Sequence, residues 1–506
     1  MSGPLAVSRV VGGTGNRYRR VRLHTVRSPC RRRRALGIKG CDVTTQLATN
    51  RAKLVDFERQ AVDAFERGDD DLTLARIEEG AIWSWGHHPG RFASSTFEQL
   101  LRAVGTRHAV TRTNTGTSST TLRVLHVLTE AYATGGHTRL TWRWLEHDRT
   151  REHTVVITEQ IHDPVPDALA RAAHGRVFHL DGESRVDRLR NLADMMMGFD
   201  LVVLNIHPHD AVVAAACAAS TDRPRTFLVN HADHVFWIGA SAADQIVELR
   251  PSAISITQER RVSSPSVSVL LPLPLDEPSA DPVRGQSLRT SLGIPDNAPV
   301  SLCLADAYKF TDTSGGRFVG LLRHALTRHT ELHHIAIGPN SETPQWRELA
   351  HDFPERLHVL GRTPAYHASF DAATFFLDSY PFSSITAALE AACWGLPVLT
   401  LGDRGVTPLG FDDAGLVPRR AGSDDEWIAT IREWSTHPEI ARREGETMRL
   451  DTLSFHRPAK WMSRWEALLR TPWQRPRDFT IPEETSFQPM DAGIELLGRT
   501  RLEMFR

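Results

Sequence analysis

Long apolar runs and paired cysteines are both missing from this sequence. No stretch of ~18 or more apolar residues occurs in the 506 residues, so the sequence predicts no membrane-spanning helix. The five cysteines are odd in number and form no CxxC pair. This argues against a disulfide framework and against a structural zinc site. We therefore expect a protein of a reducing compartment, the cytoplasm.

Acidic residues are missing from the first forty positions, which hold eleven Lys and Arg. The formal net charge of the chain is −1, so the remainder carries roughly −12. No apolar segment follows the basic residues, as a signal peptide would require. One interpretation of residues 1–46 is a disordered tail, or upstream sequence that is not part of the mature protein. The other is an anchor to nucleic acid or another anionic surface, because basic runs neutralise phosphates.

The segment that follows the basic residues is predicted to be helical. A chain of this length exceeds what one core usually supports, so we expect two domains and additional segments. Residues 47–118 are expected to form a helical extension, since Leu54, Phe57 and Ala61 fall on one helical stripe. The aromatic residues 83–92 are expected either to pack between helices or to form a surface for an acceptor or partner.

From residue 122 the pattern becomes an alternation of apolar strands and amphipathic helices. This alternation predicts parallel sheets covered by helices on both faces. We expect two facing doubly wound, Rossmann-like α/β domains, at residues 119–275 and 276–470, followed by a weakly structured tail at 471–506. The last strand that we expect before the apolar segment 267–275, which closes the first domain, is at residues 253–256. Ligands of such sheets bind beyond the carboxyl ends of the strands, so one cleft would serve both domains.

Residues 378–401 hold the motif with the most specific chemistry, DSYPFSSITAALEAACWGLPVLTL. Ser383, Ser384 and Thr386 stand where a strand gives way to a helix, and a helix start with free N–H groups attracts anions. Glu390 lies further into the same helix, where a carboxylate can reach ribose hydroxyls. The alternative is a serine-capped helix with a solvated Glu and no ligand.

This segment resembles the donor-binding segment of GT-B glycosyltransferases, in particular the O-linked N-acetylglucosamine transferase type and its bacterial relatives. The resemblance implies that Ser383, Ser384, Ile385 and Thr386 surround the diphosphate of a nucleotide sugar. It also implies that Glu390 binds the ribose. The resemblance covers about residues 120–470.

Further residues fit the same resemblance. Lys309 follows the first strand of the second domain, where a GT-B enzyme places a cation against the departing diphosphate. Gly361 and Arg362 resemble an element that precedes the base-contacting helix. A glycine loop of the kind found in family-four-like bacterial glycosyltransferases is also present, and its residues would face the donor: Gly135, Gly136 and His137.

Histidines follow two predicted strands of the first domain. His231 is our candidate general base, because imidazole titrates near neutrality. His207, Asp233 and His234 are candidates for the acceptor side. Ordinary capping and turn histidines, or a metal site, are the alternatives, and we expect no metal and no cofactor.

Together these features predict a metal-independent hexosyl- or N-acetylhexosaminyl-transferase that uses a nucleotide-diphosphate sugar, with UDP as the expected nucleotide. The acceptor, a protein, glycan or small molecule, is not specified. One alternative is a nucleotide-sugar 2-epimerase, which needs no acceptor. The other is a non-catalytic binding or scaffold protein whose basic tail contacts nucleic acid.

Overall fold

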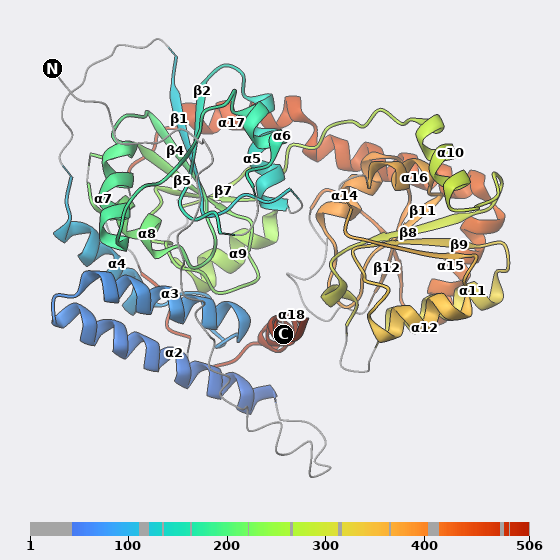
Figure 1. Cartoon of the computed structure of the whole chain (residues 1–506), viewed down its shortest axis with the longest axis horizontal. Helices are drawn as coiled ribbons and strands as arrows, with labels where there is room; N and C mark the ends of the chain where they lie inside the picture. The colour runs from blue at the N-terminus through green and yellow to red at the C-terminus, as the bar shows by residue number, and fades with distance from the viewer. Residues whose placement is uncertain are drawn as a thin grey trace.

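Two α/β halves stand side by side in the computed structural model, joined by helices that run across both (Figure 1). The described residues are 43–110, 121–133, 136–161, 164–220, 222–263, 267–311, 316–363, 366–402, 414–475, 480–484 and 486–504. The expectations for the basic tail up to residue 42 and for Gly135 lie outside them.

The first half is built on a parallel sheet, seven-stranded in the described residues, with the order β3-β2-β1-β4-β5-β6-β7. Its strands are β1 (Arg123–Leu128), β2 (Glu152–Ile157), β3 (Val177–His179), β4 (Leu201–Asn205), β5 (Arg225–Asn230), β6 (Gln245–Glu248) and β7 (Ser268–Leu270). Its helices are α5 (Gly136–His147), α6 (Asp167–Ala172), α7 (Arg185–Met196), α8 (Ala211–Ala218) and α9 (Pro251–Arg260).

The second half repeats this topology in a parallel sheet, six-stranded over the same described ranges, with the order β10-β9-β8-β11-β12-β13. Its strands are β8 (Val300–Leu304), β9 (His333–Ile337), β10 (Leu357–Gly361), β11 (Phe375–Leu377), β12 (Val398–Leu401) and β13 (Arg419–Ala421). Its helices are α10 (Pro282–Ser291), η1 (Ala307–Phe310), α11 (Arg317–Arg328), α12 (Pro344–Asp352), α13 (His367–Ala372), α14 (Thr386–Cys393), α15 (Asp424–Thr436) and α16 (Pro438–His456). The expected fold class, two doubly wound Rossmann-like sheets, is confirmed.

Alternate residues of the strands enter different cores, because successive side chains of a strand point to opposite faces. Val124 and Val203 belong to the core that continues into the second half, whereas Leu125 and Val202 belong to the core under α7 and α8. Both faces of the first sheet are therefore covered.

One expected strand of the first half is wrong. Residues 253–256 lie in α9, whose first helical residue is Pro251, and the true strand is the polar-flanked β6. A proline at the first helical position has the backbone angle that a helix needs. An apolar run of four residues does not by itself distinguish a strand from a helix.

The N-terminal extension is helical, as expected, and forms α2 (Val43–Glu66), α3 (Asp70–Gly86) and α4 (Ser95–Arg107). The expectation of a weakly structured tail is wrong for the last part of the tail. This part forms helix α18 (Pro489–Met504) and packs on α2 and α3. Helix α18 also contacts the aromatic segment 83–92, since Ile494 of α18 shares a buried cluster with Phe92. The packing interpretation of residues 83–92 therefore holds within the chain.

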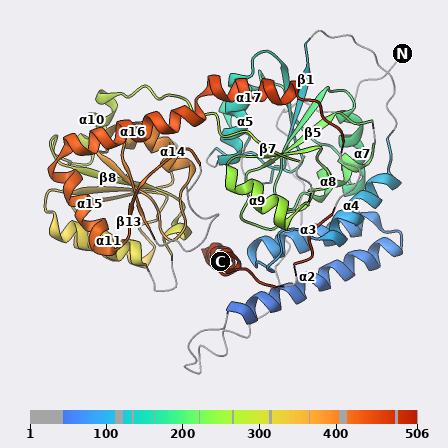
Figure 2. The ribbon, with the colours of Figure 1, turned by 180° about the vertical axis from the view of Figure 1, so that it is seen from behind.

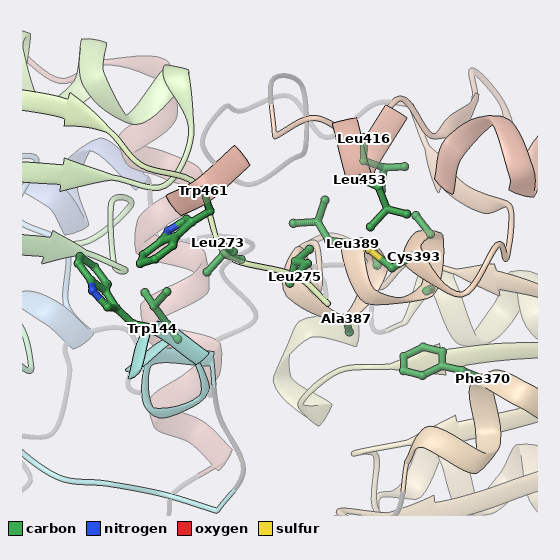
Figure 3. Packing of buried hydrophobic residues seen from close by; sticks show 14 of the residues in the cluster. Trp144, Leu273, Leu275, Phe370, Ala387, Leu389, Cys393, Leu416, Leu453 and Trp461 are labelled. Carbon is green, nitrogen blue, oxygen red and sulfur yellow. The ribbon is translucent and has the colours of Figure 1, made fainter. Parts of the chain in front are cut away.

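Helix α17 (Pro458–Arg470), assigned from the sequence to the second domain, returns to the first half (Figure 2). Trp144 of α5 meets Trp461 and Trp465 edge-on, with ring centroids 5.0 and 4.9 Å apart. Trp465 also donates a hydrogen bond to Asp148, at 2.9 Å. Figure 3 shows Trp144 and Trp461 together, with Leu273 of the connecting segment between them and the second half. The two halves are thus joined by a continuous apolar core.

Within the described residues, no helix has the length and apolar character needed to cross a membrane. Cys217, Cys303 and Cys393 are free thiols, and all three are buried.

Candidate active site

The turn after β11 is held by its own side chains, and we call residues 378–386 the serine turn. The Asp378 carboxylate accepts hydrogen bonds from the backbone N–H and the hydroxyl of Ser384, each at 2.8 Å. The Ser383 hydroxyl accepts a hydrogen bond from the N–H of Ile385, at 3.0 Å. Asp378 and both serines are buried. These short side chains hold the backbone in one shape at the start of α14.

The start of α14 has no side-chain cap, because its N-cap residue is an isoleucine, which has no polar side chain. Ile385 occupies the N-cap position with a backbone φ of 32°, a conformation that β-branched residues rarely adopt. Strained backbone of this kind collects at ligand sites. The N–H groups of a first helical turn lack intrahelical partners, so this end of α14 is suited to an anion.

Lys309 reaches the serine turn from the neighbouring strand. It lies on η1, which follows β8, and its Nζ donates a hydrogen bond to the carbonyl oxygen of Ser383, at 2.9 Å. Strands β8 and β11 are adjacent in the sheet, so their following segments meet. The structure thereby brings together a predicted cation and the predicted anion-binding turn, which are 74 residues apart in the chain.

The first half approaches the same place through the start of α5. A Cβ atom placed on Gly136 would lie 3.6 Å from the hydroxyl oxygen of Thr386. Two helix starts, one from each half, therefore face each other. Because both helix dipoles present their positive ends, an anion between them is stabilised twice.

Glu390, for which the resemblance implied a ribose contact, pairs with two arginines of the first half in this structure. Its carboxylate lies 3.0 Å from Arg139 and 2.8 Å from Arg143, both on α5, and Arg139 also donates to the Tyr366 hydroxyl. Burial opposes ionisation of Glu390, but the two guanidinium groups outweigh it and lower the pKa of the carboxyl. In this structure Glu390 is a buried interdomain ion-pair partner, because α5 and α14 lie side by side.

Histidines gather at the carboxyl ends of β1, β4 and β5. The His137 ring stacks on that of His231 with centroids 5.3 Å apart, and meets that of His207 edge-on at 5.5 Å. The Tyr132 ring lies parallel to that of His207 at 6.0 Å. The predicted residues His137, His207 and His231 therefore form one aromatic cluster, next to the start of α5.

The imidazoles of this cluster are neutral at physiological pH. Burial, followed by the proximity of His137, lowers the pKa of His231 to about 3. Burial and the neighbouring histidines also hold the pKa of His207 well below its usual value. A small pocket of about 20 Å³ is lined in part by His207 and His231, and the buried Nδ1 of His231 has no hydrogen-bond partner among the described residues. A neutral imidazole with an unpaired, buried ring nitrogen therefore lines this pocket.

Asp233 and His234, predicted on the acceptor side, are engaged with each other and with an arginine. The Asp233 carboxylate lies 2.6 Å from Arg250 and 3.2 Å from His234. Burial disfavours the charged form, but Arg250 and His234 outweigh it and lower the pKa of Asp233. A carboxylate held in this way stays ionised and is a poor proton acceptor.

Gly361 and Arg362 lie apart from the serine turn, at the end of β10. The Arg362 guanidinium pairs with Asp306 at 2.8 Å, and its side chain is 62% exposed. No contact among the described residues joins Arg362 to the serine turn, so it remains a sequence-based prediction.

Four residues near the site were missed from the sequence: Arg139, Arg143, Tyr308 and Arg501. The two arginines of α5 stand four positions apart, and this spacing places them on one helix face. The spacing was a signal in the sequence from which a shared binding partner could have been predicted. Arg501 carried no such signal, because its segment was expected to lack structure. Over the described ranges, no group of three or more His, Cys, Asp or Glu side chains is placed to hold a metal ion.

Comparisons with known proteins rest on structure, since no protein-family model matches the chain and no curated protein sequence matches it either. The Anabaena protein HepE, solved with UDP and glucose, aligns over 69% of this chain and 100% of its own, with 14% identity and a TM-score of 0.52. A glycosyltransferase from Rickettsia africae aligns over 70% of this chain and 100% of its own, with 11% identity and a TM-score of 0.54. With two facing Rossmann-like sheets of the same strand order, and these neighbours, the chain has the GT-B glycosyltransferase fold.

Proposed function

We propose that this protein transfers a sugar from a nucleotide-diphosphate sugar to an acceptor, in the cleft between its two halves. The fold does not carry this proposal, because one fold can support unrelated activities. The site carries it, through the residues that meet at the serine turn.

The observation that supports it best is the convergence of three positive features on one place. These are the uncapped start of α14, the start of α5 at Gly136, and the Lys309 ammonium against Ser383. A diphosphate carries charge that each of these stabilises. The cluster of neutral histidines adjoins the start of α5, where an uncharged acceptor hydroxyl would bind next to the donor.

The chemistry follows from the placement of the cationic features and of the neutral histidines. As the bond between the sugar and the diphosphate breaks, negative charge grows on the leaving phosphate, and Lys309 with the helix start of α14 stabilises it. The acceptor hydroxyl must lose a proton. In an inverting reaction His231 accepts it, with the negative charge of the bound diphosphate favouring the imidazolium that forms. In a retaining reaction the leaving phosphate itself accepts it.

We propose that the donor is a UDP-linked hexose or N-acetylhexosamine. We also propose that the reaction uses no metal. The HepE neighbour was also solved with UDP-glucose, which supports UDP as the first nucleotide to test. The acceptor class stays open.

The test is a thermal-shift titration of the full chain with UDP-, GDP- and dTDP-sugars. Binding to the folded state raises the melting temperature, and a ligand at a hundred times its Kd adds about 2.7 kcal/mol. We expect one nucleotide class to raise it, and to do so less in Lys309→Ala and Ser384→Ala. Lys460→Ala is the matched control, because Lys460 is exposed on α17. Equal shifts in all four proteins would contradict the proposal.

Product analysis separates transfer from the epimerase alternative. With donor alone, an epimerase forms a new sugar, whereas a transferase forms at most the products of slow donor hydrolysis. Addition of an acceptor panel should then accelerate nucleotide release. A new sugar formed rapidly without any acceptor would contradict transfer.

A further inference from the structure

The last helix of the chain lies between the N-terminal helices and the second half (Figures 1 and 2). Helix α18 contacts α2 and α3 of the N-terminal extension and also η1 of the second half, the segment that carries Lys309. Asp491, in its first turn, is buried between His88 and Arg260, each at 2.9 Å. The helix is thus anchored at its first turn against the first half of the molecule.

The position of α18 along its axis is set by a close crossing with α3. A Cβ atom placed on Gly498 would lie 2.5 Å from the carbonyl oxygen of Gly86, and one on Gly86 would lie 2.8 Å from Leu502. Two glycines are therefore needed where the helices meet. Arg501 follows Gly498 by three residues, so this crossing determines how far Arg501 extends toward the second half.

Arg501 is held by aromatic groups and not by a carboxylate. Its guanidinium lies 4.4 Å from the ring centroid of Trp85 and 5.0 Å from that of Tyr308, and donates a hydrogen bond to the Tyr308 hydroxyl at 3.2 Å. Among the described residues no acidic side chain forms an ion pair with it. Aromatic faces hold a guanidinium in place while leaving its charge uncompensated.

The neighbours of Arg501 belong to the serine turn and to the segment of Lys309. Tyr308 precedes Lys309 on η1, and Phe382, which precedes Ser383, packs on Leu497 of α18. Burial opposes ionisation of Tyr308, but the charges of Lys309 and Arg501 outweigh it and lower the pKa of the phenol. Two cations therefore flank one ring, beside the turn that faces the cleft.

We propose that Arg501 is a second cationic residue of the donor site, which binds the diphosphate of the nucleotide sugar together with Lys309. This inference rests on the proposed function. Its chemistry is that of a planar guanidinium, which forms paired hydrogen bonds with phosphate oxygens. The C-terminal helix would then complete a site whose other parts lie more than a hundred residues earlier in the chain.

The test measures UDP and UMP affinity by calorimetry for the full chain and for Arg501→Ala, Arg501→Lys and Arg499→Ala. Arg499 is the control on the same helix, because it lies two residues away, on a different side of the helix, and interacts with Glu495. We expect Arg501→Ala to weaken UDP binding roughly ten- to a hundredfold, as the loss of a charged hydrogen bond does. The loss should be smaller for UMP, intermediate for Arg501→Lys, and less than about twofold for Arg499→Ala.

Melting temperatures of the four proteins separate binding from folding. A structural role would lower the melting temperature of Arg501→Ala and weaken UDP and UMP equally, and that result would overturn the inference. Unchanged UDP affinity with a raised acceptor KM would also overturn it, and would place Arg501 on the acceptor side. If the unsubstituted chain and Arg499→Ala bind no UDP, GDP or dTDP, the proposed function itself fails.

Discussion

The two halves of this molecule share a strand order but differ at the edge where ligands bind. In the first half the carboxyl ends of β1, β4 and β5 carry stacked, half-buried histidines whose pKa values are lowered. In the second half the corresponding edge carries Lys309 and an uncapped helix start. One topology therefore carries two kinds of edge, one with neutral imidazoles and one with a cation. The difference comes from a few residues after each strand, where the backbone fold does not restrict side-chain type.

The largest expected effect concerns the ion pair that joins the halves. Glu390→Gln would leave Arg139 and Arg143 buried without a counter-charge, and should lower the free energy of unfolding by about 3–5 kcal/mol at pH 7. Urea denaturation measures this. Glu446→Gln is the control, since Glu446 forms an exposed pair with Arg449 and should cost less than ~1 kcal/mol.

The same ion pair gives a pH dependence with a definite sign. The pKa of Glu390 is lowered in the folded chain from an ordinary value of 4.5. Its stabilisation is therefore fully present above pH 4.5 and is lost as the pH falls through the folded pKa. The stability difference between the unsubstituted chain and Glu390→Gln should shrink below pH 4.5. A difference that stays constant down to pH 3 would contradict the ion-pair role.

The next effect tests the cationic edge. Lys309→Ala should lower kcat by about 10²–10³-fold, the usual loss when one stabilising group is removed from a developing negative charge. Steady-state kinetics with the donor found by thermal shift measures it, with Lys460→Ala as the unaffected control. An unchanged kcat would contradict the proposed role of Lys309 in stabilising the leaving phosphate. The proposed chemical difference between the two halves would then fail as well.

A comparable test addresses the neutral edge. His231→Ala should lower kcat by about 10²-fold if the residue accepts the proton, because general bases contribute 10²–10⁴-fold. Donor binding should change little, since Lys309 and the start of α14 hold the diphosphate without His231. With a pKa of about 3 the ring is neutral from pH 5 to 9, so the loss should not vary with pH in that interval.

His324→Gln, an exposed substitution on α11, is the control for His231. Weaker donor binding in His231→Ala would contradict the separation of roles between the two halves.

The smallest effect is expected for Arg362→Ala. Its exposed pair with Asp306 is worth less than ~1 kcal/mol, and no described contact links it to the serine turn. Donor affinity, measured by calorimetry, should change by less than about threefold. A change as large as that of Lys309→Ala would show that Arg362 reaches the donor, as the sequence resemblance implied.

Local patterns predicted most of the second half. Its strands and helices alternate as the pattern from residue 122 predicted, because that alternation is a repeated local signal. The strand β6 and the helix α18 were missed. The first has buried polar ends, Gln245 and Glu248, and the second is stabilised by distant residues such as His88 and Asn50. Neither feature has a local signature.

By itself, the sequence determined the fold class and the position of the serine turn, because strand and helix periods and the helix start are local properties. Tertiary structure decided which residues share that turn. It placed Lys309 against Ser383, committed Glu390 to Arg139 and Arg143, and placed Arg501 beside Tyr308. These pairings depend on contacts between elements far apart in the chain, so no window of the sequence contains them.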